Sequence, residues 1–177
     1  SKPPFDKVEV RQAIQWALNR DAVSQLVWFN RATSSAEAAS PANPWYSGVN
    51  VFDGAPDLDK ARALLAEAGY ADGLTVQFAS QPQVPTQPLV AQLLQQQLEP
   101  IGIKLEVQSF ESARWFEELA TQRYEITGTY WSASVDPGDH CYYPLAHSQS
   151  PWNFSFFDDS PDLDKALETF RFTLDPE

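Results

Sequence analysis

The middle of the chain, residues 74–131, carries the pattern that most restricts the possible fold. Three segments in it alternate apolar and polar residues, which is typical of β-strands. They are 74–80 (LTVQFAS), 103–110 (IKLEVQSF) and 124–131 (YEITGTYW). Between them, 88–102 and 111–123 repeat apolar residues at helical spacing. Strand, helix and strand in so short a span predict βαβ units with right-handed crossovers, and therefore an α/β fold.

The alternation within these strands also predicts how the sheet is covered. Strands that are buried on both faces usually read as unbroken apolar runs, and these do not. We therefore expect helices mainly on one face, with the other face wetter or turned toward another lobe. In the helix at 111–123, we expect Trp115, Phe116 and Leu119 to be buried.

Helical patterns flank this middle part. They lie at 8–18, at 21–29 and at 56–70. Asp21 is a candidate N-cap, since its carboxylate can accept a backbone N–H, and Gly69 is expected to end the third helix. The letters PDLDKA at 56–61 recur at 161–166, which we interpret as two helix starts with similar first-turn chemistry rather than an internal repeat.

Residues 30–56 differ in composition from the segments around them. Ser, Ala, Asn, Pro and Gly dominate, with Trp45 and Tyr46 set among them. A loop this long inside a compact domain is usually functional or disordered. The two aromatic residues indicate that it is held against another surface.

Charge and cysteine content narrow the function. The formal net charge is −12, with 12 Lys and Arg against 24 Asp and Glu, which argues against nucleic-acid binding. The single cysteine, Cys141, excludes an internal disulfide framework but not a location outside the cytoplasm.

The sequence contains no run of about 18 apolar residues, so it predicts no membrane-spanning helix. The opening Ser1-Lys2-Pro3-Pro4 and the ending Asp175-Pro176-Glu177 suggest a piece of a longer protein, with any export signal upstream.

Several segments together resemble one family. The segment PPFDKVEVRQAIQWALNRDAV resembles the pattern PPFxDxRVRQAIxxAIDRxAI of the family 5 extracellular solute-binding proteins. These are the peptide, nickel and oligosaccharide receptors of ABC importers. PDLDKARALLAEAGYADGLTVQF is similar to the family's YDPEKAKALLAEAGYPDGFTLTL. The resemblance continues through LLQQQLEPIGIKLEVQSFESARWFEEL, YEITGTYWSASVDPGDHCYYPLAHS and NFSFFDDSPDLDKALE, in order along nearly all 177 residues.

This resemblance implies a binding function without bond chemistry and without a cofactor. Residues 1–177 would form the C-terminal ligand-binding lobe, with a mixed sheet and helices, of a two-lobe periplasmic-binding-protein-like fold. The partner lobe is absent from this sequence, and the loop at 30–56 would lie on the cleft side. The two lobes would close on a small solute, and the closed monomer would dock on a membrane permease. The location would be periplasmic or extracellular, membrane-associated through a signal or lipid anchor upstream.

The stretch TYWSASVDPGDHCYYPLAH, residues 129–147, could suggest other chemistry. His140 and Cys141 are adjacent and would point in different directions, so we expect neither a metal site nor a Cys–His nucleophile. Glycoside hydrolysis could draw a carboxylate pair from the aspartates in and after this stretch, but nothing orders them into an acid and a nucleophile. These aspartates, which suit turns and helix caps better, are Asp136, Asp139, Asp158 and Asp159.

We interpret the start of this stretch as the wall of a ligand cleft. Trp131 and the serines after it follow the third strand, and open α/β sheets bind ligands outside the carboxyl ends of their strands. In the family that this chain resembles, the same segment lines the cleft. The predicted ligand-binding residues are Trp131, Ser132, Ser134, Asp136, Trp45, Tyr46, Trp152, Asn153 and Phe154. Ordinary packing stays an open alternative for the aromatic residues among them.

One position departs from the peptide-binding members of the family. They commonly carry an Asp three residues after the Trp, where it pairs with the amino terminus of the peptide, and this chain has Ser134 there. A buried ammonium group without a carboxylate is costly. The departure favours an oligosaccharide or another neutral solute slightly over a peptide as the ligand. Nickel complexes and opines are less favoured than either. A ligand-sensing domain of a transcriptional regulator and a glycoside hydrolase are the alternative functions.

Overall fold

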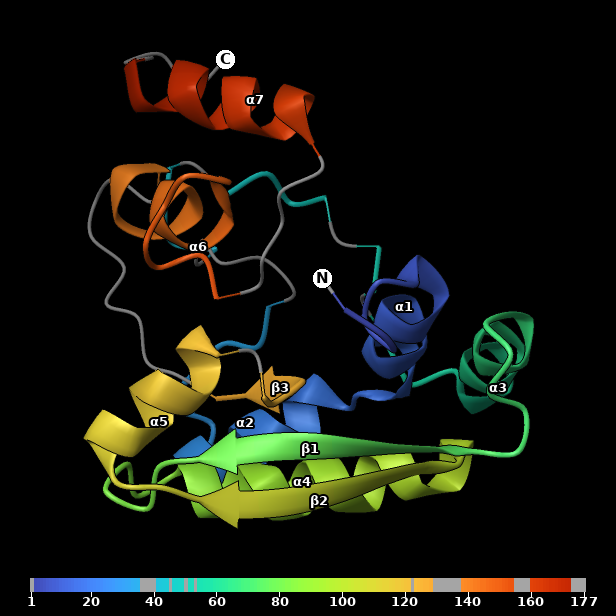
Figure 1. Ribbon diagram of the computed structural model, residues 1–177. Helices are drawn as coiled ribbons and strands as arrows, with labels where there is room; N and C mark the ends of the chain where they lie inside the picture. The colour runs from blue at the N-terminus through green and yellow to red at the C-terminus, as the bar shows by residue number, and fades with distance from the viewer. Residues whose placement is uncertain are drawn as a thin grey trace. The chain divides into compact units, whose positions relative to one another are not determined.

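The computed structural model describes most of the chain (Figure 1). The described residues are 2–35, 41–44, 46–49, 51–52, 54–121, 123–128, 138–154 and 160–172. They divide into two compact units. The sheet unit comprises Lys2–Ser34 and Gly54–Thr129, and the helical unit comprises Ser35–Asp53 and the chain from Tyr130 onward.

A parallel sheet organises the sheet unit. Its described strands are β1 (Leu74–Ser80), β2 (Ile103–Ser109) and β3 (Ile126–Thr127), in the order β2-β1-β3. The central strand β1 pairs with β2 along its whole length, from Leu74 with Ile103 to Ser80 with Ser109. Strand β3 pairs with β1 only at Ile126 and Thr127. This architecture confirms the predicted α/β fold.

The third strand begins later than the predicted residue 124. The Glu125 carboxylate accepts the backbone N–H of Gln77 at 2.8 Å, so a side chain takes the bond that a strand carbonyl would otherwise make. The Glu125 N–H still donates to the Gln77 carbonyl, at 3.3 Å. Regular pairing therefore starts at Ile126. The predicted end of this strand, residues 129–131, lies outside the described residues.

Five helices accompany the sheet, close to the predicted positions. They are α1 (Val8–Ala17), α2 (Arg20–Trp28), α3 (Leu58–Glu67), α4 (Gln87–Leu98) and α5 (Ser112–Ala120), and a 3-10 turn, Glu99–Ile101, follows α4. Gly69 follows α3 with a φ of +86°, the left-handed conformation that favours glycine, as predicted.

The predicted cap of α2 was wrong by two residues. The N-cap is Asn19, whose side chain accepts the N–H of Ala22 at 2.9 Å. Asp21 lies inside the first turn, where its carboxylate accepts a hydrogen bond from the Ser34 hydroxyl at 2.5 Å. Asn and Asp cap helices about equally well, so the sequence alone did not separate the two.

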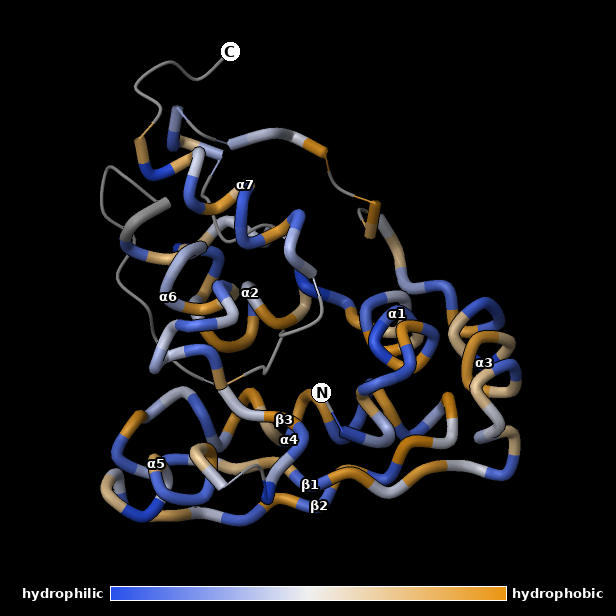
Figure 2. Tube along the Cα trace, turned by 45° about the horizontal axis from the view of Figure 1, so that its top comes forward, coloured by the Kyte–Doolittle hydropathy of each residue, from blue (hydrophilic) through white to orange (hydrophobic). Residues whose placement is uncertain are grey.

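One apolar face of the sheet forms the core. Val76, Phe78, Ile103 and Leu105 are buried on it together with residues of α1, α3 and α4. Helix α4 lies along β1 and β2, and α1 packs against both α3 and α4 (Figure 1). Figure 2 shows apolar and polar residues on each of α1 and α3, as expected for helices with one buried face.

The opposite face is polar toward the amino ends of the strands. Thr75 and Lys104 are exposed there. The Glu106 carboxylate accepts from Lys104 Nζ at 2.7 Å and from Gln77 Nε2 at 2.8 Å. These two bonds and the charge of Lys104 lower the pKa of Glu106. The predicted wetter face is therefore present in this half of the sheet.

Toward the carboxyl ends, helix α5 covers this second face as well. Ala79 is fully buried there, and Trp115 on α5 is 3% exposed. The prediction of helices mainly on one face therefore holds only for the amino half of the strands. The predicted burial of Phe116 was wrong, because Trp115, Glu118 and Leu119 occupy the inner face at helical spacing and Phe116 is 43% exposed.

The helical unit contains a π-helical turn, Gly138–Tyr142, followed by α6 (Tyr143–Ala146) and α7 (Pro161–Phe172). The Tyr143 ring stacks on His147 with centroids 4.3 Å apart, and the Arg171 guanidinium lies 4.0 Å from the Tyr143 centroid. The buried His147 also places Nε2 3.4 Å from Glu168 Oε1. These contacts join α6 to α7.

The start of α7 is the second PDLDKA segment, which confirms its interpretation as a helix start. Among the described residues, no helix has both the length and the apolar character needed to cross a membrane.

Candidate functional site

The candidate site is the edge of the sheet where β1 and β3 end. In parallel sheets whose strand order begins 2-1-3, ligands bind outside the carboxyl ends of β1 and β3. The order here is β2-β1-β3, and β1 ends at Ser80 while β3 ends at Thr127. Polar side chains from α4 and α5 meet the backbone at this edge.

Gln87 joins the two strand ends from the α4 side. It is 4% exposed and stands in the first turn of the helix. Its Oε1 accepts the backbone N–H of Gln81, just after β1, at 2.5 Å. Its Nε2 donates to the carbonyl of Gly128, just after β3. The carboxamide thus uses both of its functions to bridge two backbone segments.

Gly128 leaves room for this bridge. A Cβ added to it would lie 3.7 Å from Gln87 Cγ and 3.7 Å from Phe78 Cζ, in ordinary van der Waals contact. A larger side chain in the same direction would have to displace one of them. An alanine would therefore fit at position 128 beside Gln87, and only a larger side chain would crowd the bridge.

Trp115 holds the same edge from the α5 side. Its indole Nε1 donates to Thr127 Oγ1 at 3.0 Å and lies 3.4 Å from the Ala79 carbonyl. The Thr127 hydroxyl donates to the same Ala79 carbonyl at 2.8 Å. These bonds reinforce the short pairing between β3 and β1.

Ser80, the last residue of β1, adds an unusual feature. It is 1% exposed, and its hydroxyl makes no hydrogen bond within the described part of the chain. Most buried polar groups are hydrogen-bonded, so a buried hydroxyl in this state is uncommon.

The predicted site residues fall into two groups. Trp131, Ser132, Ser134, Asp136 and Trp45 lie outside the described residues, and their role stays a prediction. The other four belong to the helical unit: Tyr46, Trp152, Asn153 and Phe154. The rings of Trp152, which is 45% exposed, and Phe154 meet edge-on with centroids 6.1 Å apart. Asn153 is buried and donates from Nδ2 to the His147 carbonyl at 3.1 Å, so this part of its side chain serves local packing.

The residues considered for metal binding and catalysis have other surroundings. The described residues contain no group of three His, Cys, Asp or Glu side chains that could hold a metal ion. Cys141 is buried, and burial raises the pKa of its thiol, which disfavours the nucleophilic thiolate. His147 Nδ1 accepts the N–H of Gln149 at 3.1 Å, which ties this ring to the local turn.

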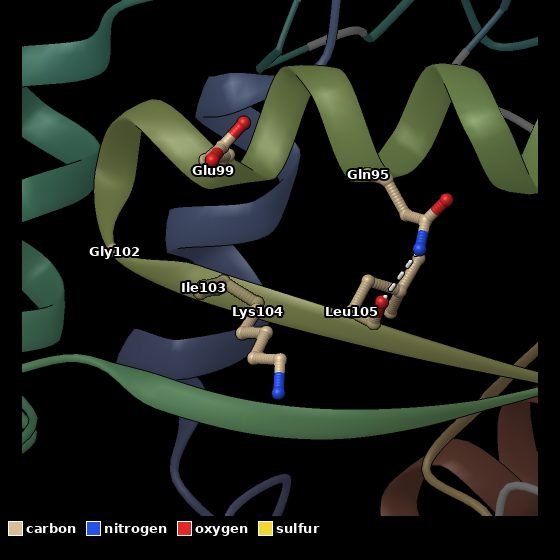
Figure 3. A pocket seen from close by; sticks show the side chains of 6 residues that line it. All are labelled: Gln95, Glu99, Gly102, Ile103, Lys104 and Leu105. Carbon is tan, nitrogen blue, oxygen red and sulfur yellow. Dashed lines mark hydrogen bonds between the residues drawn. The ribbon is translucent and has the colours of Figure 1, made fainter.

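An open groove of about 460 Å³ lies elsewhere, along β2 (Figure 3). It is lined by Gln95, Glu99, Gly102, Ile103, Lys104 and Leu105. Gln95 Nε2 donates to the Leu105 carbonyl at 2.9 Å, and Figure 3 shows the Lys104 side chain on the side of β2 away from α4. The groove borders the amino half of β2, so the strand ends at Ser80 and Thr127 do not line it.

The sequence pattern did not identify Gln87, Trp115 and Thr127 as residues that build this edge. Helical spacing predicts that Trp115 is buried, and its ring is. The same pattern does not predict the hydrogen bond that its indole N–H makes. A weak signal was present at Gln87, a polar residue placed directly before the apolar stripe of a helix. Only the folded chain brings these three residues together.

Comparison with known proteins agrees with this architecture. The family model described as bacterial extracellular solute-binding proteins, family 5 Middle, matches residues 1–153. The glutathione-binding protein GsiB of Pectobacterium atrosepticum is 34% identical over 181 residues, which cover 96% of this chain and 35% of that protein. The chain thus spans about a third of the length of such relatives.

Solved structures show the same fold. The periplasmic binding protein DppA of Helicobacter pylori, in complex with the peptide STSA, superposes with a TM-score of 0.86 at 24% identity, over 98% of this chain and 34% of that one. MoaA of A. tumefacien R10, in complex with mannopinic acid, has a TM-score of 0.79 at 28% identity, over 99% of this chain and 36% of that one. With the match over residues 1–153, these findings show that the chain belongs to the bacterial extracellular solute-binding proteins of family 5.

Proposed function

We propose that residues 1–177 are the C-terminal ligand-binding lobe of a receptor that captures a small solute for an ABC importer. The observation that carries this proposal is the family match over residues 1–153, combined with an α/β sheet whose carboxyl edge is held by buried polar side chains. The solute would bind between this edge and a second lobe outside this sequence. The closed receptor would then deliver the solute to a membrane permease.

The proposed solute is peptide-like, with glutathione as the first candidate. The support is the glutathione-binding relative, which is 34% identical over 96% of the chain. Mannopinic acid, bound by a structural neighbour at 28% identity, shares with peptides an ionisable carboxyl group. Ser134 by itself favours an oligosaccharide slightly over a peptide. The solute of the glutathione-binding relative outweighs that single position, and the amino group of a peptide-like solute would need a carboxylate from elsewhere in the receptor.

The contact residues that we propose are those predicted from the sequence. Trp131 would offer an aromatic face to the solute, and Ser132 and Ser134 would offer hydroxyl groups. The loop at 30–56 would contribute Trp45 and Tyr46 from the cleft side. The remaining candidates are Asp136, Trp152, Asn153 and Phe154.

The receptor would act without bond chemistry or a cofactor. It would be a monomer located in the periplasm or outside the cell and associated with the membrane. The family is one of extracellular solute-binding proteins, which supports the location and the lack of an enzymatic role.

The experiment uses the full-length receptor and titration calorimetry. Glutathione, a neutral tripeptide, maltotriose and a nickel chelate are each titrated into the purified protein. The proposal expects binding of glutathione or the tripeptide and no turnover of either. Binding of maltotriose alone would overturn the solute class, and binding of none of the four together with hydrolysis of a chromogenic glycoside would overturn the receptor role.

A further inference from the structure

We infer that Gln87 is a positioning residue for the solute site, because its carboxamide sets the distance between the loop after β1 and the end of β3. The inference rests on the proposed function and deepens it. The bridge runs from the Gln81 N–H through Gln87 to the Gly128 carbonyl, and the side chain is 4% exposed. Gln87 acts on the backbone of the edge and is not itself proposed to touch the solute.

The short pairing of β3 makes such a bridge necessary. Among the described residues, two of β3 pair with β1, Ile126 and Thr127, so these ladder bonds alone hold the end of β3 weakly. Trp115 and Thr127 fasten β3 to Ala79 from the α5 side, at Thr127, its last residue. Gln87 reaches one residue further, to Gly128, from the α4 side. Gln87 therefore links α4 to the chain where it leaves the sheet, and Thr127 Oγ1 lies 3.4 Å from the same Gly128 carbonyl.

The chemistry of the bridge requires a carboxamide. The Gln81 N–H needs an acceptor and the Gly128 carbonyl needs a donor, and a Gln side chain supplies both. Glu of the same length accepts from Gln81 but places a carboxylate against the Gly128 carbonyl. Met has a similar length and supplies neither group, so it removes the side-chain partner from two part-buried backbone groups.

Positioning matters because a ligand site binds well only while its contact groups keep their relative positions. A site whose supporting residues are left unheld loses the geometry on which binding depends. The end of β1 and the end of β3 form the edge at which a ligand is expected. A shift of one relative to the other would therefore weaken binding even in a receptor that stays folded.

Helix α4 supplies a matched control. Gln95 also donates from Nε2 to a strand carbonyl, that of Leu105, at 2.9 Å. Its bond lies on β2 beside the open groove and away from the carboxyl edge. Gln95→Glu therefore makes the same chemical change in the same helix at a place that the inference does not involve.

The experiment compares Gln87→Glu, Gln87→Met and Gln95→Glu in the full-length receptor. Calorimetry with glutathione and the neutral tripeptide gives the Kd, and thermal unfolding gives the stability of the unliganded form. We expect both Gln87 variants to raise the Kd of the solute that the wild type binds by up to about tenfold, the size of one lost hydrogen bond. Gln95→Glu should leave that Kd within about twofold. An unchanged Kd in both Gln87 variants, or an equal rise in Gln95→Glu, overturns the inference.

A second measurement separates this inference from the proposed function. Hydrogen exchange of the Gln81 amide reports the bridge without any solute, because this amide donates to Gln87 Oε1. It should exchange about tenfold faster in Gln87→Met and stay unchanged in Gln95→Glu. If the wild type binds neither solute, the proposed solute class is wrong, and the Gln81 exchange still decides whether Gln87 holds the edge. Unchanged exchange in Gln87→Met overturns the positioning role in either case.

Discussion

The indole of Trp115 and the hydroxyl of Thr127 form a relay that fastens β3 to β1. Trp115 Nε1 donates to Thr127 Oγ1 at 3.0 Å, and Thr127 Oγ1 donates to the Ala79 carbonyl at 2.8 Å. Both partners come from elements that flank the carboxyl edge, and Trp115 is buried. Because two residues of β3 are paired in the part of the chain that the structure describes, this relay adds substantially to its attachment.

Trp115→Phe should lower the stability of the protein. The change removes the indole N–H and part of the buried ring surface, and it should cost about 1 to 3 kcal/mol in the free energy of unfolding. Urea denaturation followed by circular dichroism measures this cost. Phe172→Leu, at an 83% exposed position on α7, is the control and should change stability by less than about 0.5 kcal/mol. Equal effects at both positions would contradict the relay.

Phe29→Gly should raise stability. Phe29 caps α2 in the left-handed conformation, with φ 53° and ψ 41°, and its side chain is 81% exposed. Glycine adopts this conformation without the steric cost of a Cβ, and little buried surface is lost, so we expect a gain of about 1 kcal/mol. The urea midpoint measures it. Asn30→Gly, at the next left-handed residue (φ 58°), should gain less because Asn tolerates this conformation. A loss of stability in Phe29→Gly would contradict the prediction.

Asp164 should make stability fall in strong acid. Hydrogen bonds from the Ser148 hydroxyl and from its backbone N–H, with a smaller effect of His147, lower the pKa of Asp164 below its ordinary value. The folded pKa thus lies below the unfolded one. The stabilisation is present above the unfolded pKa and is lost as the pH falls through the folded pKa.

Ser148→Ala tests this origin. Removal of the hydroxyl should raise the pKa of Asp164 toward its ordinary value, since the largest cause of the shift is gone. Carbon-detected NMR of the Asp164 carboxyl across an acid titration measures the change. Ser150→Ala, a nearby serine whose hydroxyl accepts from Trp152 N at 3.2 Å, is the control and should leave this titration unchanged. An identical Asp164 titration in wild type and Ser148→Ala would show that the hydroxyl is not the cause.

Ser80→Ala should be neutral or stabilising by up to about 1 kcal/mol. The Ser80 hydroxyl is buried and makes no hydrogen bond within the described residues, so its removal abolishes a desolvation cost and breaks no such bond. Thermal unfolding measures the effect. A clear loss of stability would show instead that the hydroxyl is bonded in the intact protein, for example to a buried water.

Trp131→Ala in the full-length receptor should weaken solute binding by about 2 kcal/mol or more, the usual cost of removing a central aromatic anchor. Calorimetry measures the change in Kd, and an unchanged value would remove Trp131 from the proposed site.

Ser134→Asp should strengthen binding of peptides with a free amino end. No gain in that variant would mean that another residue pairs with the amino group.

Local sequence patterns predicted the elements of the sheet unit well. Alternation marked β1 and β2, because residues two apart share a face of a strand. Helical spacing marked α1 to α5, and Gly69 marked the end of α3 since few other residues adopt its φ of +86°. One error came where two similar residues competed, since Asn19 rather than Asp21 caps α2. The other came where helical spacing turns the charged Glu118 inward and leaves the apolar Phe116 outside on α5.

What the sequence determined by itself is the α/β class, the order of its elements and the family, because these depend on local periodicity and on the order of motifs along the chain. Tertiary structure alone decided how the carboxyl edge is built. Gln87 meets Gly128 across 41 residues, and Thr127 meets Ala79 across 48. Hydrogen bonds between residues so far apart depend on how helices pack on both faces of the sheet, and no local pattern records that packing.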